Sequence, residues 1–301
     1  MTAITGFSVF DPAFKDNFQN GWFIQSINQS KLWNLFGNKV VQNSATDYYK
    51  SMGHDDLNDM SAVAKGAETV FSSLAVEQRG VTLGRAGRAD LLSFDEIMKM
   101  GGDDPTGQLV QRHAEAVGRY RDQVIINALI GSATVKGASA VALPAGSKVG
   151  IQYGESPAAD IGLTFNKIRK AKVKLDMAGI PEQGRIAIVS SEDMDSLLAY
   201  AQVTSADYAS VKAIIEGTIE GYRWMGFNWV VSNLLPSAAS VRKNIFTHTN
   251  ALKIGYNDTP STTIDRLPTH NNNVAVITET YIGAVRMEEA AVIEVSNVDP
   301  A

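Results

Sequence analysis

The sequence predicts a mixed α+β fold, and three observations lead to that prediction. Apolar residues recur at helical spacing from about residue 105 to 130, including Leu109, Val117 and Val124. A second helical pattern, over residues 160–178, precedes the apolar run RIAIVSS, which has the composition of a buried strand. The C-terminal segment alternates apolar and polar residues in NVAVITETYIGAVRMEEAAVIEVSNV, which is typical of long antiparallel strands.

The composition limits the classes of protein to consider. The chain has 301 residues and 45% hydrophobic content, enough for one large domain or two smaller ones. Its net charge of −5 predicts no broad attraction to nucleic acid or to anionic membranes. It has no cysteine, which excludes disulfides and thiol chemistry. The N-terminus lacks the pattern of a secretory signal, and no segment approaches the ~18 consecutive apolar residues of a membrane span.

Residues 1–43 are rich in aromatic side chains set among Asn, Gln and Ser. A helix from about Pro12 to Phe36 is predicted there. A segment this polar cannot bury its aromatics against itself, so they need another surface, either the rest of the chain or a neighbouring molecule. The eight aromatic residues are Phe7, Phe10, Phe14, Phe18, Trp22, Phe23, Trp33 and Phe36.

Residues 44–80 are polar and only weakly periodic. Short extended runs at Ala45–Tyr49 and Thr69–Val76 predict a long hairpin across a polar tip. A loop this long without its own core is uncommon in a compact domain and usually has a function or is disordered.

The middle of the chain predicts a strand, a short helix and then the long helix. VTLGRAGRADLLSFDEIMKM reads as a strand running into a short helix. Asp103 and Asp104 can cap the next helix, with Pro105 in its first turn. That helix should stop at Gly131, where a left-handed ending is expected. The small, Gly-rich residues that follow, 131–157, predict a hinge.

Residues 158–270 predict an α/β unit. The helix over 160–178 ends at Gly179–Pro181, and Ser190 with Asp193 resembles a capping box that opens a helix over 192–201. Thr204 with Asp207 repeats that device before a helix over 206–216. A strand pair is expected in TIEGYRWMGFNWVVSN and NIFTHTNALKIGY.

Motifs for catalysis, cofactors and metals are missing from the sequence. There is no phosphate-binding loop, no GxGxxG and no GxSxG elbow, and GVTLGRAGR reads better as a bent strand. The four histidines do not fall at metal-ligand spacing, and His113 is expected to be a core residue of the long helix. Residues 55–59 are acidic but lack the glycine and distal glutamate of a calcium loop, so a solvated tip is expected. We therefore predict no catalytic residue, no cofactor and no metal.

Two groups of basic residues remain without stacking aromatics between them. Those on the helix over 160–178 form either a solvated face or an inter-subunit salt-bridge surface. The others lie along the predicted strand. The two groups are Lys167, Arg169, Lys170, Lys172 and Lys174, and Arg79, Arg85 and Arg88.

The order of these elements resembles the coat-protein fold of tailed bacteriophages, the Hong Kong ninety-seven type. VEQRGVTLGRAGRADLLSFDEI is similar to the strand after that family's extension loop, and QLVQRHAEAVGRYRDQVIINALIG to its spine helix. RIAIVSSEDMDSLL is similar to its axial strand and helix. GTIEGYRWMGFNWVVSNLLP, with Gly226, Phe227, Leu235 and Pro236, resembles short-tailed phage coats, and YIGAVRMEEAAVIEV resembles their closing strands.

The resemblance implies a division of the chain into four parts. These are an N-terminal arm (1–43), an extension loop (44–80), a peripheral domain (81–157 and 271–301, with the spine helix at about 105–130) and an axial domain (158–270). Contacts between subunits are expected in or beside the arm and the loop. We assign them to Trp22, Phe23, Lys50, Lys65, Glu68 and Arg79.

The resemblance also implies function and partners. The expected protein is a non-enzymatic major capsid protein of the virion that assembles, in the host bacterial cytoplasm, as hexamers and pentamers into an icosahedral shell. Its partners would be copies of itself, a portal and the packaged double-stranded DNA, contacted non-specifically, with no membrane. No charged helical propeptide precedes the arm, so a separate scaffolding protein is expected. The alternatives are an encapsulin-like nanocompartment shell, a tail component, and an enzyme with an α/β core.

Overall fold

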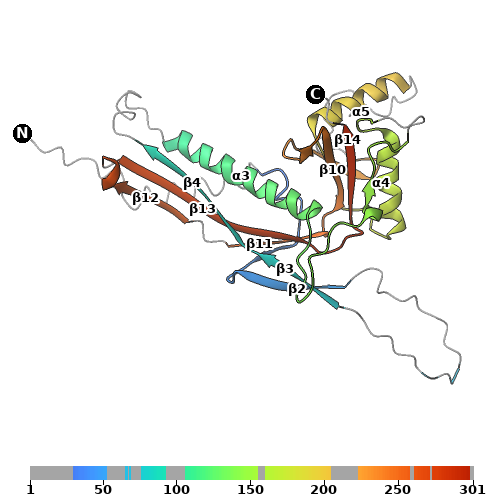
Figure 1. Ribbon diagram of the computed structural model, residues 1–301, viewed down its shortest axis with the longest axis horizontal. Helices are drawn as coiled ribbons and strands as arrows, with labels where there is room; N and C mark the ends of the chain where they lie inside the picture. The colour runs from blue at the N-terminus through green and yellow to red at the C-terminus, as the bar shows by residue number, and fades with distance from the viewer. Residues whose placement is uncertain are drawn as a thin grey trace, which may run out of the picture. The chain divides into compact units, whose positions relative to one another are not determined.

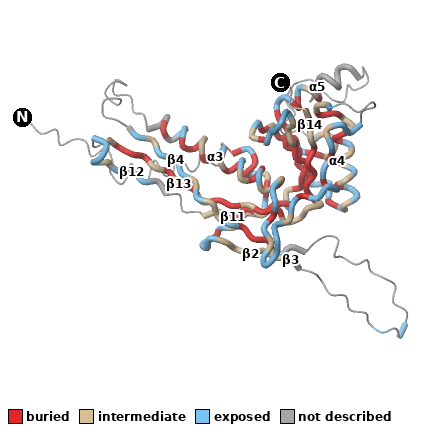
Figure 2. Tube along the Cα trace, in the orientation of Figure 1, coloured by how far each residue is buried: buried red, intermediate tan, exposed pale blue. Residues whose placement is uncertain are grey.

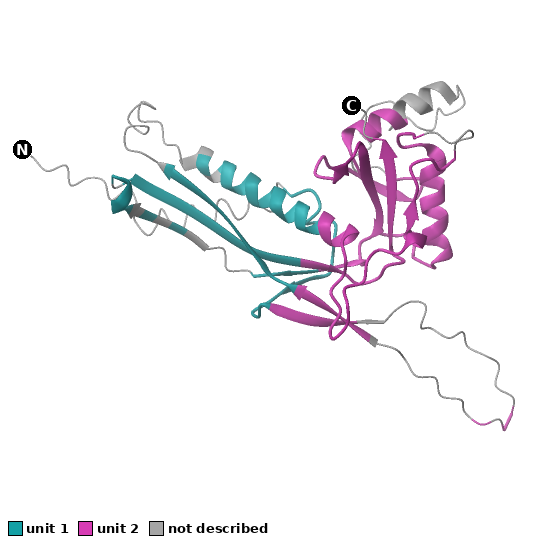
Figure 3. Ribbon diagram, viewed as in Figure 1, with its two compact units in different colours: residues 1–45, 82–125, 254–283 teal, residues 46–81, 126–253, 284–301 magenta. Residues whose placement is uncertain are grey.

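The computed structural model describes residues 30–52, 65–66, 68, 76–92, 106–154, 160–204, 223–257, 261–271 and 273–298 (Figure 1). The chain forms two compact units and passes repeatedly from one to the other. Unit 1 comprises residues 1–45, 82–125 and 254–283, and unit 2 comprises residues 46–81, 126–253 and 284–301 (Figure 3). Helices and strands occur in both, as the sequence predicts.

A five-stranded sheet forms most of unit 1. Its strands run in the order β1, β11, β13, β12, and β4 also pairs with β13. β13 is antiparallel to both β12 and β4. The strands are β1 (Lys39–Val41), β4 (Gly84–Leu92), β11 (Leu252–Tyr256), β12 (Ser261–Leu267) and β13 (Asn273–Arg286). The long strand predicted near the C-terminus is therefore the centre of this sheet.

The long helix α3 (Thr106–Ile130) confirms the prediction for residues 105–130. In unit 1 it lies along the sheet and buries its apolar stripe, including Leu109, His113 and Val117 (Figures 1 and 2). It ends at Gly131, but the expected left-handed ending is wrong, because Gly131 is not among the positive-φ glycines of the described residues. The space requires glycine instead, since a β-carbon at this position would lie 2.6 Å from the carbonyl oxygen of Asn127.

A seven-stranded sheet forms the centre of unit 2. Its order is β5, β14, β10, β6, β8, β7, with β9 paired to β10. Aromatic rings of Phe227, Trp229 and Phe246 fill its core, with ring centroids 5.1 Å and 6.0 Å apart. The strands are β5 (Lys148–Val149), β6 (Arg185–Val189), β7 (Arg223–Trp224), β8 (Phe227–Val231), β9 (Ser237–Ala238), β10 (Val241–His248) and β14 (Val292–Val298).

Within the described residues, unit 2 contains the last turn of α3 and the helices α4 (Phe165–Met177) and α5 (Ser191–Thr204). The chain leaves α4 through Gly179, which adopts a φ of 69° and so confirms the expected stop. The pairing of Ser190 with Asp193 that the sequence predicts at the start of α5 is also confirmed. Asp193 N–H donates to Ser190 Oγ at 3.0 Å, and Ser190 Oγ donates to the Asp193 carboxylate at 2.7 Å.

A separate two-stranded sheet pairs β2 (Thr46–Met52) with β3 (Val76–Thr82). The first strand agrees with the extended run predicted at Ala45–Tyr49. The second strand begins where the predicted run Thr69–Val76 ends. A β-carbon at Gly80 would lie 3.0 Å from the Tyr48 ring, so the missing side chain lets these strands pack closely. Residues 69–75 and 53–64 lie outside the described residues.

Strand partners differ from the sequence-based expectation at two places. The strands expected to pair within residues 218–256 do form, but β6 lies between β8 and β10. The expected boundary between the axial and peripheral domains, at residues 270 and 271, would separate β12 from β13 and β10 from β14. In the structure β12 pairs with β13, and β14 pairs with β10 and β5. Alternation identifies a strand and its buried face, but it does not say which strand lies beside it.

Three predicted helices fall wholly or partly outside the described residues. Of the helix expected over residues 12–36, the described part, residues 30–36, is a turn and not a helix. Three predictions lie outside the described residues: the rest of that helix, the short helix expected at the end of residues 81–100, and the helix expected over 206–216.

Candidate functional site

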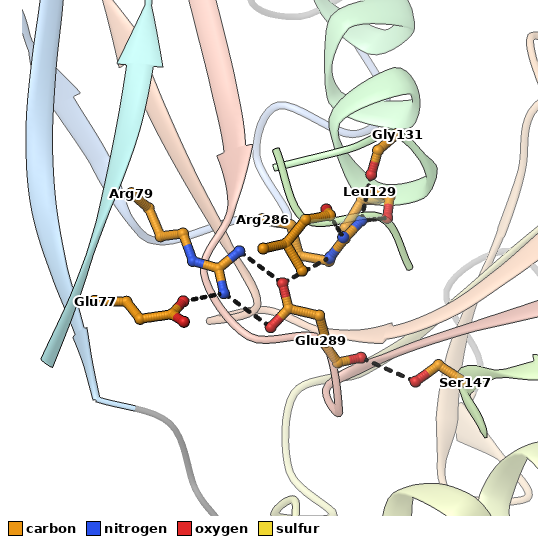
Figure 4. A network of polar contacts seen from close by, with 8 residues as sticks. Glu77, Arg79, Leu129, Gly131, Ser147, Arg286 and Glu289 are labelled. Carbon is orange, nitrogen blue, oxygen red and sulfur yellow. Dashed lines mark hydrogen bonds and ion pairs between the residues drawn. The ribbon is translucent and has the colours of Figure 1, made fainter. Parts of the chain in front are cut away.

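An ion-pair network lies where the β2–β3 sheet joins the rest of unit 2 (Figure 4). The guanidinium of Arg79, on β3, donates through Nη1 to Glu289 Oε1 at 2.7 Å and through Nη2 to Glu289 Oε2 at 3.0 Å. Nη2 also donates to Glu77 Oε2 at 2.7 Å. Arg79 is almost fully buried, whereas Glu77 is exposed. The two-point pair with Glu289 is therefore the contact that neutralises a buried charge.

Arg286 extends this network to the end of α3. Its Nη1 donates to the carbonyl oxygens of Leu129 at 2.9 Å and Gly131 at 2.6 Å, and its Nη2 donates to that of Val141 at 3.1 Å. The side chain is completely buried. A cation at these carbonyls satisfies acceptors that a helix C-terminus leaves unpaired and complements its negative dipole end.

Glu289 is shared between the two arginines. Its Oε1 lies 3.7 Å from Arg286 Nε, and its backbone oxygen accepts a hydrogen bond from Ser147 Oγ at 3.3 Å. Burial lowers the pKa of Arg286, the Glu289 carboxylate opposes that effect, and the nearby Arg79 charge adds to it. The network thus ties β3, the last turn of α3 and the segment before β14 to one carboxylate. It determines where the β2–β3 sheet leaves the body of unit 2.

Another buried cation, Lys167, fastens α4 to the seven-stranded sheet. Its Nζ donates to the carbonyl oxygens of Ile161 and Ser296, both at 2.9 Å, and to Asn297 Oδ1 at 3.1 Å. Lys167 belongs to the basic group for which the sequence left a solvated face or a salt-bridge surface open. This residue fits neither interpretation, because its side chain is fully buried.

In unit 1, Asp122 on α3 holds the segment at which the described chain begins. Its carboxylate accepts hydrogen bonds from Ser30 Oγ and from the backbone N–H groups of Leu32 and Lys31, both at 3.1 Å. Ser30 Oγ in turn accepts from Trp33 N–H at 3.1 Å. Burial raises the pKa of Asp122, although these hydrogen bonds oppose the shift.

Trp33 reinforces this attachment. The cations of Lys39 and Arg121 each lie 4.9 Å from the centre of its ring, and Tyr256 meets it edge-on with ring centroids 5.2 Å apart. The part of the predicted arm that begins at Ser30 is therefore fixed to α3 and β11.

The structure places the six predicted contact residues in different surroundings. Lys50, Lys65 and Glu68 are exposed, while Arg79 is buried and its guanidinium binds Glu289 and Glu77 of its own subunit. Trp22 and Phe23 lie outside the described residues. An inter-subunit role for these six residues stays a prediction.

Sequence reasoning did not identify Asp122, Arg286 or Glu289, or the buried role of Lys167. One usable signal was Arg286 itself, a charge at the end of the apolar run IGAV in a strand buried on both faces. A charged residue there needs a buried partner.

Other functional classes receive no support from the described residues. No group of three or more potential metal ligands occurs among them. None of the helices in the described part of the chain has the length and hydropathy needed to span a membrane. His113 is buried on α3, as expected, and its Nε2 lies 3.3 Å from an Asp90 carboxylate oxygen.

Comparison with known proteins decides the family. A family model described as phage capsid protein matches residues 11–299. The chain belongs to the phage capsid protein family. It is thus a structural subunit of a virion capsid, and its matched region includes both units, the β2–β3 sheet and all the buried networks described above.

Solved structures show that this capsid protein has the tailed-phage capsid fold. The capsid of Ralstonia phage GP4 matches with a TM-score of 0.65 and 11% identity, covering 89% of this chain and 88% of that chain. The capsid of cyanophage P-SCSP1u matches with a TM-score of 0.63 and 14% identity, covering 88% and 87%. A virus-like particle from Pyrococcus furiosus matches with a TM-score of 0.54 and 10% identity, covering 93% and 98%. A search of the curated proteins finds no match.

Proposed function

We propose that this capsid protein is the major coat subunit, assembling as hexamers and pentamers into an icosahedral shell around the double-stranded DNA genome of a phage. The observation that carries the proposal is the family match over residues 11–299. The buried networks support it, because they anchor to the body of the subunit the two segments predicted to reach neighbouring subunits. Asp122 fixes the root of the arm, and the Arg79–Glu289–Arg286 network fixes the root of the β2–β3 sheet.

The roles of the parts follow from this proposal. Residues 1–43 are the N-terminal arm and residues 44–80 the extension loop, as the resemblance implies. We assign the peripheral role to unit 1, with its long helix on a sheet, and the axial role to the seven-stranded sheet of unit 2. This assignment moves β14 to the axial part, since it pairs with β10.

The proposed partners are further copies of the chain, a separate scaffolding protein, a portal and packaged DNA, with assembly in the host bacterial cytoplasm. The protein acts by geometry and not by catalysis. Its net charge of −5 suits a shell that contacts DNA non-specifically, because a strongly cationic lining would hold the packaged phosphates tightly.

Expression of the chain, followed by electron microscopy and light scattering over a concentration series, tests this function. Closed particles, or rings of five and six subunits, are expected. Obligate interfaces of this kind bury on the order of 2,000–5,000 Å². A monodisperse monomer at all concentrations, with and without lysate of phage-infected cells, would contradict the proposal. Tubes would indicate a tail component.

A second function has one observation in its favour. The fold also matches a virus-like particle from Pyrococcus furiosus, so a nanocompartment shell that encloses protein is the alternative. Nuclease-protected DNA in particles from infected cells supports the phage capsid. Protein cargo without DNA supports the alternative.

A further inference from the structure

One face of α4 is exposed and carries large apolar side chains. Arg169, Val173 and Met177 follow one another at i, i+4 and i+8, so they form a stripe along the helix. Met177 is 83% exposed and Val173 is 40% exposed. An exposed methionine beside an exposed valine on one helix face is typical of a contact surface.

The edge of this stripe is basic and aromatic. Lys170, one residue after Arg169, places its Nζ 5.7 Å from the ring centre of Tyr153, which is itself 38% exposed. Asp176 is the only acidic residue on α4, and its carboxylate binds Arg185 at 2.6 Å. The α4 stripe, defined as Tyr153, Arg169, Lys170, Val173 and Met177, therefore presents apolar surface with unneutralised positive charge.

The first turns of α5 carry the opposite charge on a different part of unit 2. Its acidic residues are Glu192, Asp193 and Asp195, and the helix has no basic residue. Asp193 is buried as part of the capping box, whereas Glu192 and Asp195 are exposed. Glu192 is partly neutralised by Arg242 at 2.7 Å. Asp195 is the more available of the two exposed charges.

We infer that the α4 stripe of one subunit docks against the acidic start of α5 on the next copy of the chain. This inference rests on the proposed function, because it names a contact within the proposed rings. Opposite charges on two different helices of one subunit attract when identical copies meet head to tail, and a head-to-tail contact that closes makes a ring. A two-fold contact of the stripe with itself would set Arg169 and Lys170 against their own copies.

Nucleic acid is a poorer occupant for this face. Phosphate groups are bound by cations and hydrogen-bond donors, and the exposed apolar residues of the stripe, Met177 and Val173, offer neither. A protein surface with acidic residues beside apolar ones is a better partner, because it can contact both the basic and the apolar side chains of the stripe.

The absence of cysteine from the chain allows a direct test by disulfide formation. Met177→Cys and Asp195→Cys are placed in separate chains that carry tags of different length, and the chains are co-expressed and oxidised. The expected product on a non-reducing gel is a mixed dimer with one copy of each tag. A chain with both substitutions should give a ladder that ends at five or six subunits.

Three outcomes overturn the contact. One is the absence of the mixed dimer in particles that look normal in the microscope. The second is efficient dimerisation of Met177→Cys alone, which would show a two-fold contact. The third is equal cross-linking when Asp195→Cys is combined with Ser139→Cys, an exposed control position elsewhere in unit 2. If the unmodified chain forms no particles or rings at all, the proposed function itself fails.

Charge reversal gives an independent readout. Arg169→Glu and Asp195→Arg should each lower the assembled fraction about tenfold, the effect of one unfavourable charge pair worth about 1.4 kcal/mol. The two substitutions in one chain should restore assembly, because the pair is re-formed with its signs exchanged. Failure of the double variant to recover, with both single variants folded by circular dichroism, would contradict the pairing of α4 with α5.

Discussion

Arg79 and Glu289 form a two-point ion pair although they are 210 residues apart in the sequence, with Nη1–Oε1 at 2.7 Å and Nη2–Oε2 at 3.0 Å. Glu289 also lies beside the buried Arg286. One carboxylate therefore lies between two guanidinium groups at the junction between the β2–β3 sheet and the end of α3.

Glu289→Ala tests this arrangement. Two buried arginines would lose their shared counter-ion, and we expect the free energy of unfolding to fall by about 3–5 kcal/mol. Glu77→Ala is the matched control, because Glu77 binds the same guanidinium from an exposed position and should cost less than about 1 kcal/mol. Urea unfolding followed by tryptophan fluorescence measures both. An equal loss of unfolding free energy in the two variants would mean that Glu289 contributes no more to stability than the exposed Glu77.

Lys167→Met tests whether the buried ammonium group stabilises unit 2. Methionine keeps much of the side-chain length but leaves the carbonyl oxygens of Ile161 and Ser296 and the Asn297 amide without their donor. Each unsatisfied acceptor destabilises the folded state by about 1–3 kcal/mol, whereas the loss of a buried charge removes its desolvation penalty and offsets part of this effect. We expect a net loss of about 2 kcal/mol or more. Lys172→Met, from the half-exposed side of α4, should change stability little. A Lys167→Met protein of undiminished stability would show that desolvating the ammonium costs more than its hydrogen bonds contribute.

Val117→Asp should prevent unit 1 from folding. Val117 is buried on α3, and an unpaired carboxylate there costs about 3 kcal/mol or more. Insoluble protein is the expected result. Arg119→Asp, two residues away on the exposed side of the helix, should remain soluble. Assembly-competent Val117→Asp would place this face of α3 against solvent.

His113 should make the subunit sensitive to mild acid. Burial lowers its pKa from 6.5, Asp90 opposes this effect, and Arg88 and Arg112 add to it. Below pH 6.5, His113 is therefore protonated more readily in the unfolded chain than in the folded chain, so the free energy of unfolding decreases as the pH falls. Above that pH, His113 is neutral in both states and does not affect stability.

His113→Gln should remove this part of the pH dependence. The test compares melting temperatures of the two proteins between about pH 7.5 and 5.5, where His113 contributes at most about 1.4 kcal/mol per pH unit. The difference between the proteins isolates the histidine from Asp122 and Asp193. Burial raises the pKa of both of these carboxyl groups, so their effect runs in the opposite direction. Parallel curves would show that folding does not change the pKa of His113.

Replacing residues 53–75 with a short Gly-Ser linker tests the proposed extension loop. Ordering each backbone residue costs roughly 1–2 kcal/mol, and the segment has few large apolar side chains to offset that cost within one subunit. The melting temperature and circular dichroism of the body should stay nearly unchanged, while particle formation is lost. An unfolded variant would assign the segment to the core of the subunit. If the variant forms normal shells, the segment has no role in assembly.

The sequence by itself determined the elements whose signals are local. The bounds of α3, the buried strand β6 and the capping box of Ser190 with Asp193 could all be predicted, because helical period, apolar runs and caps depend on residues a few positions apart. The resemblance carried by the order of these elements also led to the family.

Only the tertiary structure decided which strands are neighbours and where the buried charges find partners. β6 separates β8 from β10, and β14 joins β10, although alternation along each strand would suit several partners equally. Lys167 reads in the sequence as one of five cations on a helix, and its burial becomes visible only when β14 places Ser296 and Asn297 beside it. Arg79 and Glu289 likewise come together only because the fold brings β3 beside the segment that precedes β14. A charge can be stable inside a protein only where the fold supplies a counter-charge or acceptors, and for these residues most of those groups come from distant parts of the chain.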